Sequence, residues 1–501
     1  MSAIEETIRD QTVALSSGST ARTPLPTQFL KLLCSVRFGV TMLILLGTAC
    51  LVGMLIMQQN VDGFQRYFAE LTPAQRLVYG RMGFFDIYHS WYFNALLAIL
   101  SVNIILASVD RFPKTWRYVS KPALTPPVRW LRSQKQTADV EISRSCDDVV
   151  HSVSSAMQRA GWRRIRTRER NGSVYVFGES GRWNRFGAYA VHVALLTIFF
   201  GGFLTAQLGN TGSMPLSPGQ SSNRMSETVV DLDKTNEITK QLPFQIHCTD
   251  IQQKLIKKEG SISAMNTIDW STTFTINDET GTHDAHVQLN RPFDYRGYRF
   301  FQASFTTVGR ARNITIKATP AAGGEPEIVA IPRNGSAELA DGTKVNFSEF
   351  RGDFRIGPED PNENTTEYPN PAAVLQVSKQ GNAPQSAYAF GPQMANIPVA
   401  GKPVAGYTFQ LIDFEKVADQ HILSIQRDPG AAVVYVGFVL LFLTLVSVFF
   451  FSHQRVWAVV ERNSNDPASL ILGGNANRNH NGFSDRFSKF VREVLETSRE
   501  T

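Results

Sequence analysis

Four uninterrupted apolar runs divide the chain into segments of two kinds. They occupy residues 38–57, 92–109, 186–208 and 431–451, and none contains Asp, Glu, Lys or Arg. Because a helix rises about 1.5 Å per residue, roughly 20 apolar residues cross the hydrocarbon layer of a bilayer. The pattern therefore predicts four transmembrane helices. The polar leader, residues 1–37, is too long and too mixed in charge for a cleavable secretion signal.

The segment between the third and fourth runs, residues 209–430, has a different periodicity. Apolar and polar residues alternate there over short stretches separated by Gly, Pro, Asn and Asp, as in residues 267–276, 286–289, 313–317, 345–350, 373–377 and 407–413. A period of two is typical of strands with one buried face. We predict a large antiparallel β-rich domain, either a sandwich or an open sheet, with its own core.

Residues 110–185 predict a small α/β lobe between the second and third spans. Helical spacing over 146–161 is followed by strand-like runs at 163–168 and 173–177. The Asn171-Gly172 pair between the two runs is a strong hairpin signal.

The tail, residues 452–501, contains an amphipathic stretch at 483–498. We expect a packed surface helix, although binding to the membrane surface or to a partner stays open. His453, Arg455 and Trp457 are expected to anchor the fourth span at the membrane boundary.

The distribution of Lys and Arg predicts which segments lie on the cytoplasmic side of the membrane. Residues 110–185 hold 16 Lys and Arg against 7 Asp and Glu, whereas residues 209–430 hold 20 against 25. Basic segments stay in the cytoplasm, so we expect both termini and the lobe to be cytoplasmic. The loop of residues 58–91 and the β-rich domain are then exterior. The net charge of +6 reflects this asymmetry, and the absence of an aromatic-interleaved basic motif argues against nucleic-acid binding.

The cysteines exclude several chemistries. Cys34, Cys50, Cys146 and Cys248 lie far apart, and the chain has neither a CxxC nor a CxxCH motif. Thiol–disulfide exchange and covalent haem attachment to this chain are therefore not expected. Paired carboxylates, a nucleophile–base set or a phosphate-binding loop do not stand out either, so catalysis by this chain alone is not expected.

His192 is the candidate functional residue, because it lies within the third apolar run. A titratable ring inside a membrane normally faces a partner, a cavity or a cofactor. Two interpretations are open from the residues alone: a hydrogen bond to a neighbouring helix, or a ligand to a metal or haem iron. His89, beside Trp91 and Tyr92 at the mouth of the second span, is a weaker candidate for contact with haem, since interfacial packing with the aromatic belt is the favoured interpretation.

The chain resembles the ResB/CcsB family of System II cytochrome c maturation, with all four spans in order. Segments that carry the resemblance are Ser35-Val36-Arg37-Phe38, Gln58-Gln59-Asn60, residues 83–93 (GFFDIYHSWYF), residues 181–187 (GRWNRFG), His192, Gly201-Gly202, Gly212, Met214, Asn290-Arg291-Pro292, residues 297–304 (GYRFFQAS) and Asp428-Pro429-Gly430. The ordered set is specific, although no single motif is.

The resemblance implies a function and a set of partners. Family members bind haem b non-covalently, together with a ResC/CcsA-type membrane protein. They deliver the haem to the exterior face, where it is attached to the reduced CxxCH cysteines of an apocytochrome c, so thiol-reducing proteins are indirect partners. The resemblance makes His192 an axial haem ligand in the membrane, with the second axial ligand on the partner. It implies a subunit of a holocytochrome c synthase complex.

Two other functions and a choice of membrane remain open at this stage. The chain could be a sensor with the β-rich domain as receiver, or a scaffold in which His192 is structural. A bacterial plasma membrane is expected, with a thylakoid membrane as the alternative. An apocytochrome segment could add as a strand to an exposed sheet edge of the β-rich domain.

Overall fold

The computed structural model describes residues 25–61, 63–142, 145–356, 366–379, 382–394, 396–461 and 468–499. Most of the predicted leader, residues 1–24, lies outside the described residues. The chain forms two compact units, which are described separately. The helix–lobe unit comprises residues 1–50, 89–204 and 430–501, and the β-rich unit comprises residues 51–88 and 205–429.

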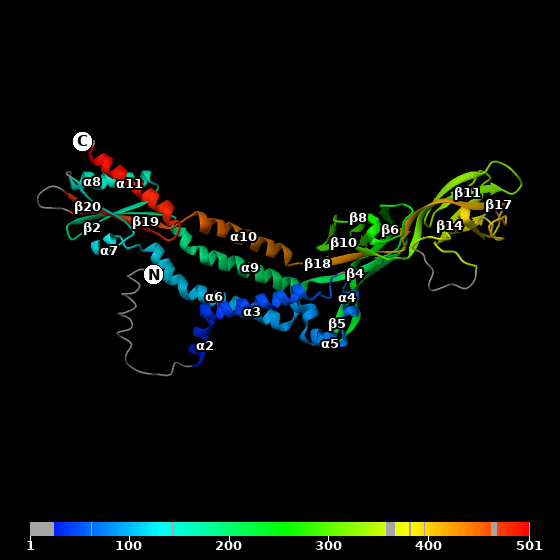
Figure 1. Ribbon diagram of the computed structural model, residues 1–501, viewed down its shortest axis with the longest axis horizontal. Coiled ribbons are helices and arrows are strands. Elements are labelled where there is room, and N and C mark those ends of the chain that lie inside the picture. The colour runs from blue at the N-terminus through cyan, green and yellow to red at the C-terminus, as the bar shows by residue number, and fades with distance from the viewer. Residues whose placement is uncertain are drawn as a thin grey trace. The chain divides into compact units, whose positions relative to one another are not determined.

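Four helices among the described residues are long and apolar enough to cross a membrane, as the sequence predicts (Figure 1). They are α3 (Val36–Leu55), α6 (Trp91–Ser120), α9 (Gly187–Leu208), which follows the short helix η2 (Arg182–Phe186), and α10 (Ala431–Phe450). α6 continues 11 residues beyond the predicted end at Val109, because Asp110 to Ser120 keep helical geometry outside the apolar run. A short helix, α2 (Leu25–Leu33), precedes α3.

Small residues allow the spans to pack closely. A Cβ atom on Gly437 of α10 would lie 2.6 Å from the Ile198 side chain of α9. Gly201 of α9 is similarly close to Val434 of α10. Because lipid removes the hydrophobic drive for helix association, close backbone approach of this kind is what holds spans together. α9 and α10 therefore form a tight pair.

The lobe is a five-stranded antiparallel sheet with strand order β1-β20-β19-β3-β2. Its strands are β1 (Gln136–Ile142), β2 (Arg164–Arg170), β3 (Ser173–Ser180), β19 (Gln454–Glu461) and β20 (Ala468–Ala476). β2 and β3 form the predicted hairpin, with positive φ at Asn171 and Gly172. The two tail strands, β19 and β20, were not predicted from the hydrophobic pattern and lie inside the sheet, between β1 and β3. The lobe is thus built from segments on both sides of the last two spans.

Both faces of this sheet are covered. On one face, α8 (Cys146–Arg159) and α11 (His480–Arg499) pack on Val456, Ala458 and Val460 of β19. On the other face, α7 (Val128–Arg132) packs on Trp457 and Val459. β19 is consequently buried along most of its length, and the amphipathic tail helix covers a core, as predicted.

The residues expected to anchor the fourth span are buried instead. His453, Arg455 and Trp457 are only 2%, 4% and 3% exposed. The prediction of an interfacial anchor is therefore wrong, because the chain turns directly from α10 into the central strand of the lobe.

The β-rich unit contains two sheets, in agreement with the predicted antiparallel β-rich architecture. The first has strand order β8-β7-β6-β5-β4-β18-β10-β9. Its strands are β4 (Asn210–Leu216), β5 (Ser221–Asp231), β6 (Lys234–Leu255), β7 (Thr267–Asp278), β8 (Gly281–Gln288), β9 (Phe293–Tyr295), β10 (Tyr298–Phe305) and β18 (His421–Arg427). Residues of β8 and β10, such as Val287 and Phe300, share one core, so this sheet curves around its own apolar interior.

The second sheet has strand order β12-β11-β17-β16-β15-β14-β13. Its strands are β11 (Gly309–Pro320), β12 (Glu327–Pro332), β13 (Ser336–Glu338), β14 (Lys344–Arg351), β15 (Ala372–Ser378), β16 (Gln385–Phe390) and β17 (Tyr407–Ala418). All neighbours are antiparallel except β16 and β17, which meet in one parallel pair. This sheet has a separate core that includes Ile314, Leu375 and Phe409.

The predicted loop of residues 58–91 is largely helical. It contains α4 (Phe64–Glu70), α5 (Pro73–Met82) and η1 (Phe84–His89). Phe64, Phe68 and Phe85 form a small core against Val230 of β5. A hydrogen bond of 2.9 Å from the Val230 N–H to Gln59 Oε1 adds to this attachment.

Candidate functional site

His192 lies in the second turn of α9 and faces α6. Its Nδ1 is 2.8 Å from Oγ of Ser108, and the ring is partly buried. Ser108 in turn donates a hydrogen bond of 2.6 Å to the Ile104 carbonyl, one turn earlier in α6. The histidine is thus oriented by a serine from the neighbouring span.

The Ser108 contacts determine which ring nitrogen carries the proton. A serine hydroxyl has one proton, and here it is directed to the Ile104 carbonyl. Ser108 Oγ therefore accepts from Nδ1–H. Because an apolar layer disfavours a charged ring, we infer a neutral imidazole, which keeps its lone pair on Nε2. None of the described residues forms a hydrogen bond with Nε2. A hydrogen-bond partner that holds one ring nitrogen in this way orients the other nitrogen for a metal.

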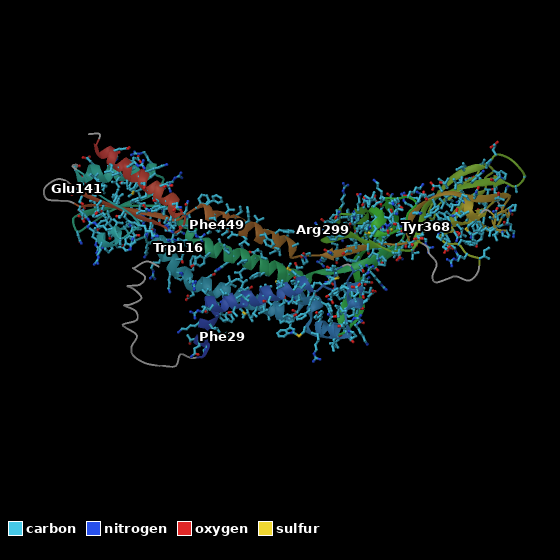
Figure 2. The ribbon with its side chains drawn as sticks, viewed as in Figure 1. Phe29, Trp116, Glu141, Arg299, Tyr368 and Phe449 are labelled. Atoms are coloured by element: carbon cyan, nitrogen blue, oxygen red, sulfur yellow. The ribbon has the colours of Figure 1, made fainter. Side chains whose placement is uncertain are left out.

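Aromatic side chains lie where α6 contacts α9, beginning one turn beyond Ser108. We call this contact between the two helices the α6–α9 seam. Phe112 and Trp116 of α6 lie one and two turns beyond Ser108, and Phe112 contacts both Tyr189 and Phe186 at ring-centroid distances of 5.5 and 5.8 Å. The Tyr189 hydroxyl is 2.9 Å from Thr115 Oγ1. Phe112 and Trp116 are nevertheless 42% and 51% exposed, and Trp116 projects from the helix surface (Figure 2). We call Phe112, Trp116, Phe186 and Tyr189 the aromatic cluster.

His89 is not brought near His192. It is exposed, and its carbonyl accepts a 3.3 Å hydrogen bond from Asn94 Nδ2 at the start of α6. Trp91 and Ser108 are 17 residues apart on α6, which is about 25 Å along a helix axis. The two histidines therefore lie far apart along α6 and cannot ligate the same metal.

A second polar arrangement lies where α10 enters the lobe. Glu179 Oε1 accepts hydrogen bonds of 2.8 Å from His453 Nε2 and 3.0 Å from Arg455 Nε. Arg185 Nε donates to His453 Nδ1 at 3.0 Å, so both ring nitrogens are used. We call these four residues the junction network. Asn184, next to Arg185 in the chain, also donates to the Val448 carbonyl near the end of α10.

Burial and hydrogen bonding shift the pKa values in the junction network. Burial raises the pKa of the Glu179 carboxyl, but hydrogen bonds from His453 and the charge of Arg455 together bring it below its usual value. Burial lowers the pKa of His453, and the Glu179 hydrogen bond offsets only part of this effect. The network is therefore an ionised carboxylate held by a neutral histidine and an arginine.

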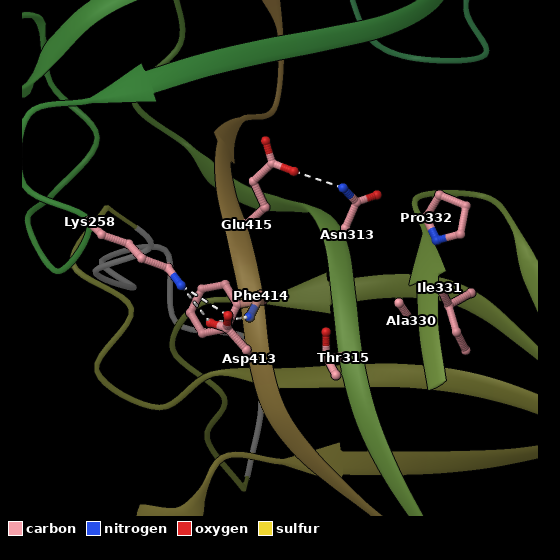
Figure 3. Close-up of a pocket in the computed structure, with 9 residues that line it drawn as sticks. All are labelled: Lys258, Asn313, Thr315, Ala330, Ile331, Pro332, Asp413, Phe414 and Glu415. Atoms are coloured by element: carbon pink, nitrogen blue, oxygen red, sulfur yellow. Dashed lines mark hydrogen bonds and ion pairs between the residues drawn. The ribbon is translucent and has the colours of Figure 1, made fainter. Parts of the chain in front are cut away.

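The β-rich unit has a cleft of about 520 Å³ over β11, β12 and β17 (Figure 3). Its charged groups are already paired: Lys258 with Asp413 at 2.9 Å, and Glu415 with Asn313 at 2.7 Å. Carboxylates committed in this way are poorly placed to act as general acid or base. The cleft is better suited to docking than to chemistry.

Two further chemistries find no support in the described part of the chain. No group of three or more His, Cys, Asp or Glu side chains within the described ranges could hold a metal ion. Cys248 is fully buried, and burial raises the pKa of its thiol to about 12. A thiol of this kind is almost entirely protonated at neutral pH and unreactive.

Sequence reasoning identified His192 but missed its setting. Ser108 is 84 residues away in sequence, and only helix packing places it opposite the ring. A hydroxyl in an otherwise apolar span was a usable signal, because such groups often bond across helices. The spacing of Ser108, Phe112 and Trp116 by four residues also marks one face of α6.

Comparison with known proteins agrees with this architecture. A family model described as the ResB-like family matches residues 36–390 and 370–488. The cytochrome c biogenesis protein CcsB of Synechococcus sp. strain CC9605 is 24% identical over 476 residues, covering 92% of this chain and 95% of that protein. The cytochrome c biogenesis protein ResB of Bacillus subtilis strain 168 is 20% identical over 479 residues, covering 89% and 83% respectively. The chain belongs to the ResB-like family.

Proposed function

We propose that this membrane protein acts in cytochrome c maturation by binding haem b at the α6–α9 seam and passing it to the attachment reaction. The observation that carries the proposal is the His192–Ser108 pair, which leaves the Nε2 lone pair free on a neutral ring. The relatives that match nearly the whole chain are named as cytochrome c biogenesis proteins, which agrees with this role.

The residues present fit a haem as cargo. Neutral imidazole is a common axial ligand for haem iron, and Ser108 would increase its basicity and fix its orientation. The aromatic cluster supplies a flat apolar surface on the same seam. Arg111, exposed on α6 three residues after Ser108, is a cation suited to a haem propionate. Haem itself is the group to be joined to the CxxCH cysteines of apocytochrome c.

The second axial ligand would come from a ResC/CcsA-type partner. His192 is the only histidine within the four apolar runs of the sequence. The aromatic cluster is exposed in this chain, which leaves surface for a second membrane protein to cover. Haem held between two chains could leave as the interface opens, which suits a delivery role.

The lobe supports one orientation in the membrane. Because β19 pairs with β3, the end of α6, the start of α9 and the end of α10 all lie on the lobe's side. The basic character of residues 110–185 favours a cytoplasmic location for that side. The β-rich unit would then lie on the exterior face, in a bacterial plasma membrane with a thylakoid membrane as the alternative.

The test replaces His192 with glycine and measures the Soret band of the chain co-purified with its partner. We expect His192→Gly to lose the band and added imidazole to restore it, since free imidazole fills the space left by the ring. His89→Gly is the matched control and should keep its haem. An unchanged spectrum in His192→Gly would contradict the proposal and favour a scaffold in which His192 is structural.

For the apocytochrome we propose an edge of the second β sheet. β12 is an edge strand beside the cleft of Figure 3, and Ile328 on it is 66% exposed. An extended CxxCH peptide could add there as a further strand. Hydrogen exchange should slow in β12 when the peptide is added to the full chain, while the opposite edge β13 serves as control. Equal exchange with and without peptide would contradict this docking site.

A further inference from the structure

A cavity of about 780 Å³ lies where α9 and α10 meet the lobe. Arg182 and Trp183 of η2 line it. Also lining it are Phe450 and Phe451, at the end of α10 and directly after it, and Arg163 and Arg164, directly before β2 and at its start. η2 leads directly into one span, and α10 is another span ending at Phe450. The cavity therefore lies at the level where the chain leaves the apolar layer, on the lobe's side.

The cavity has an excess of positive charge that the chain does not neutralise. Its lining includes four arginines and one carboxylate, the Glu179 side chain already held by His453 and Arg455. Of the carboxylates in the described ranges, none forms an ion pair with Arg163, Arg164, Arg182 or Arg486. Such a cluster attracts an anion from outside the chain.

Arg486 shows this most clearly, because it is half-buried. Its Nη1 donates to Gln454 Oε1 at 2.8 Å, its Nε donates to the Ala160 carbonyl, and its guanidinium lies 5.3 Å from the Trp162 ring centroid. These partners are neutral. Burial lowers the pKa of Arg486, as expected for a cation without a counter-charge.

The rim of the cavity is apolar and exposed. Trp183, Phe450 and Phe451 are 62%, 79% and 64% exposed. Exposed aromatic side chains at a membrane boundary are typical of contact with lipid near the headgroups. A free inorganic anion would contact only the arginines. An anionic lipid would contact the arginines with its headgroup and the exposed aromatic side chains with its acyl chains.

We propose that this cavity binds the phosphate headgroup of an anionic phospholipid, whose acyl chains lie along Phe450 and Phe451. Basic pockets between spans at this depth are suited to such headgroups, and guanidinium groups bind phosphate through paired hydrogen bonds. The site lies between α9, α10 and the lobe, whereas His192 faces α6. The inference therefore does not depend on haem binding.

The test titrates phosphatidylglycerol into the full-length chain in detergent and counts retained lipid by native mass spectrometry. The variant is Arg163→Gln with Arg164→Gln, both exposed and thus tolerant of substitution. At about 1 kcal/mol per basic residue, we expect binding to weaken roughly thirtyfold. Arg166→Gln with Arg168→Gln removes the same charge from the same strand outside the cavity and should bind as the parent does.

Two further binding measurements identify the ligand. Phosphatidylcholine, which has no net charge, should bind much more weakly than phosphatidylglycerol. Phe451→Ser should weaken lipid binding but leave competition by inorganic phosphate unchanged. Equal binding by the two arginine pairs, no preference for the anionic lipid, or no effect of Phe451→Ser would each overturn the proposal.

Discussion

The α6–α9 seam and the junction network each orient one histidine, but they leave the two rings in different states. At the junction, His453 donates from Nε2 to Glu179 and accepts at Nδ1 from Arg185, so the ring is saturated. At the seam, His192 uses Nδ1 with Ser108, and Nε2 keeps its lone pair. The availability of a histidine to a ligand therefore depends on how many of its ring nitrogens the protein already occupies. The ring of His453 is held at both nitrogens, whereas the ring of His192 keeps one nitrogen without a hydrogen-bond partner among the described residues.

The largest effect should come from breaking the junction network. Glu179→Ala would leave Arg455 and His453 buried without their acceptor, which typically costs about 3–5 kcal/mol of folding stability. Urea unfolding of the full chain in detergent, with proteolysis of the lobe as a second readout, would measure the loss. Haem bound per folded molecule should be unchanged.

The matched control for this prediction is Glu141→Ala. Glu141 is an exposed glutamate of β1 in the same lobe (Figure 2), and its removal should change stability by less than about 0.5 kcal/mol. Loss of haem in Glu179→Ala without loss of stability would contradict the structural role given to the junction.

An intermediate effect should come from Ser108→Ala, which removes the hydrogen-bond partner of His192 and keeps the ring. Loss of an outer-shell partner typically weakens metal binding about 10–100-fold. Haem retention during dialysis of the co-purified complex would measure the change. Ser101→Ala is a close control, because Ser101 makes the same bond to its own helix, 2.7 Å to the Leu97 carbonyl, without contacting His192. Equal haem loss in the two variants would show that Ser108 has no specific role in haem binding.

The smallest effect concerns pH. The pKa values of His453 and Glu179 are both lowered in the folded chain, so the unfolded chain binds protons more readily than the folded one. Their stabilisation is complete above the ordinary histidine pKa of about 6.5 and is lost as the pH falls, first through His453 and then through Glu179. Each proton contributes at most about 1.4 kcal/mol per pH unit.

Unfolding midpoints measured from neutral to acidic pH would test this direction. His453→Gln keeps a donor for Glu179 and an acceptor for Arg185 but does not titrate, so its midpoint should fall less between about pH 7 and pH 5. An identical pH dependence in the two proteins would place the titrating group elsewhere.

The sequence was sufficient for features that depend on local pattern. The four spans follow from uninterrupted apolar runs, and the β-rich unit follows from the period of two in residues such as Thr272, Phe274 and Ile276, which alternate inward. His192 stood out for the same local reason, as a titratable residue within an apolar run. Its role as a ligand remains a prediction.

Long-range pairing was beyond the sequence. Glu179 and His453 are 274 residues apart, and each reads alone as an ordinary residue flanking a span. β19 and β20 were missed because a strand buried on both faces does not alternate, and VWAVV resembles the end of an apolar run. Contacts between segments this far apart in sequence depend on how the spans pack. That packing cannot be predicted from a short stretch of sequence.

The central position of β19 has a consequence for biosynthesis. Until the ribosome has made β19 and the last span is inserted, β3 lacks one of its two neighbours, and the apolar side of α8 lacks the strand on which it packs. The lobe is therefore completed only by a chain whose final span has entered the membrane in the correct direction. Nascent, truncated or misinserted chains would expose an open strand edge and an apolar face, both of which favour aggregation.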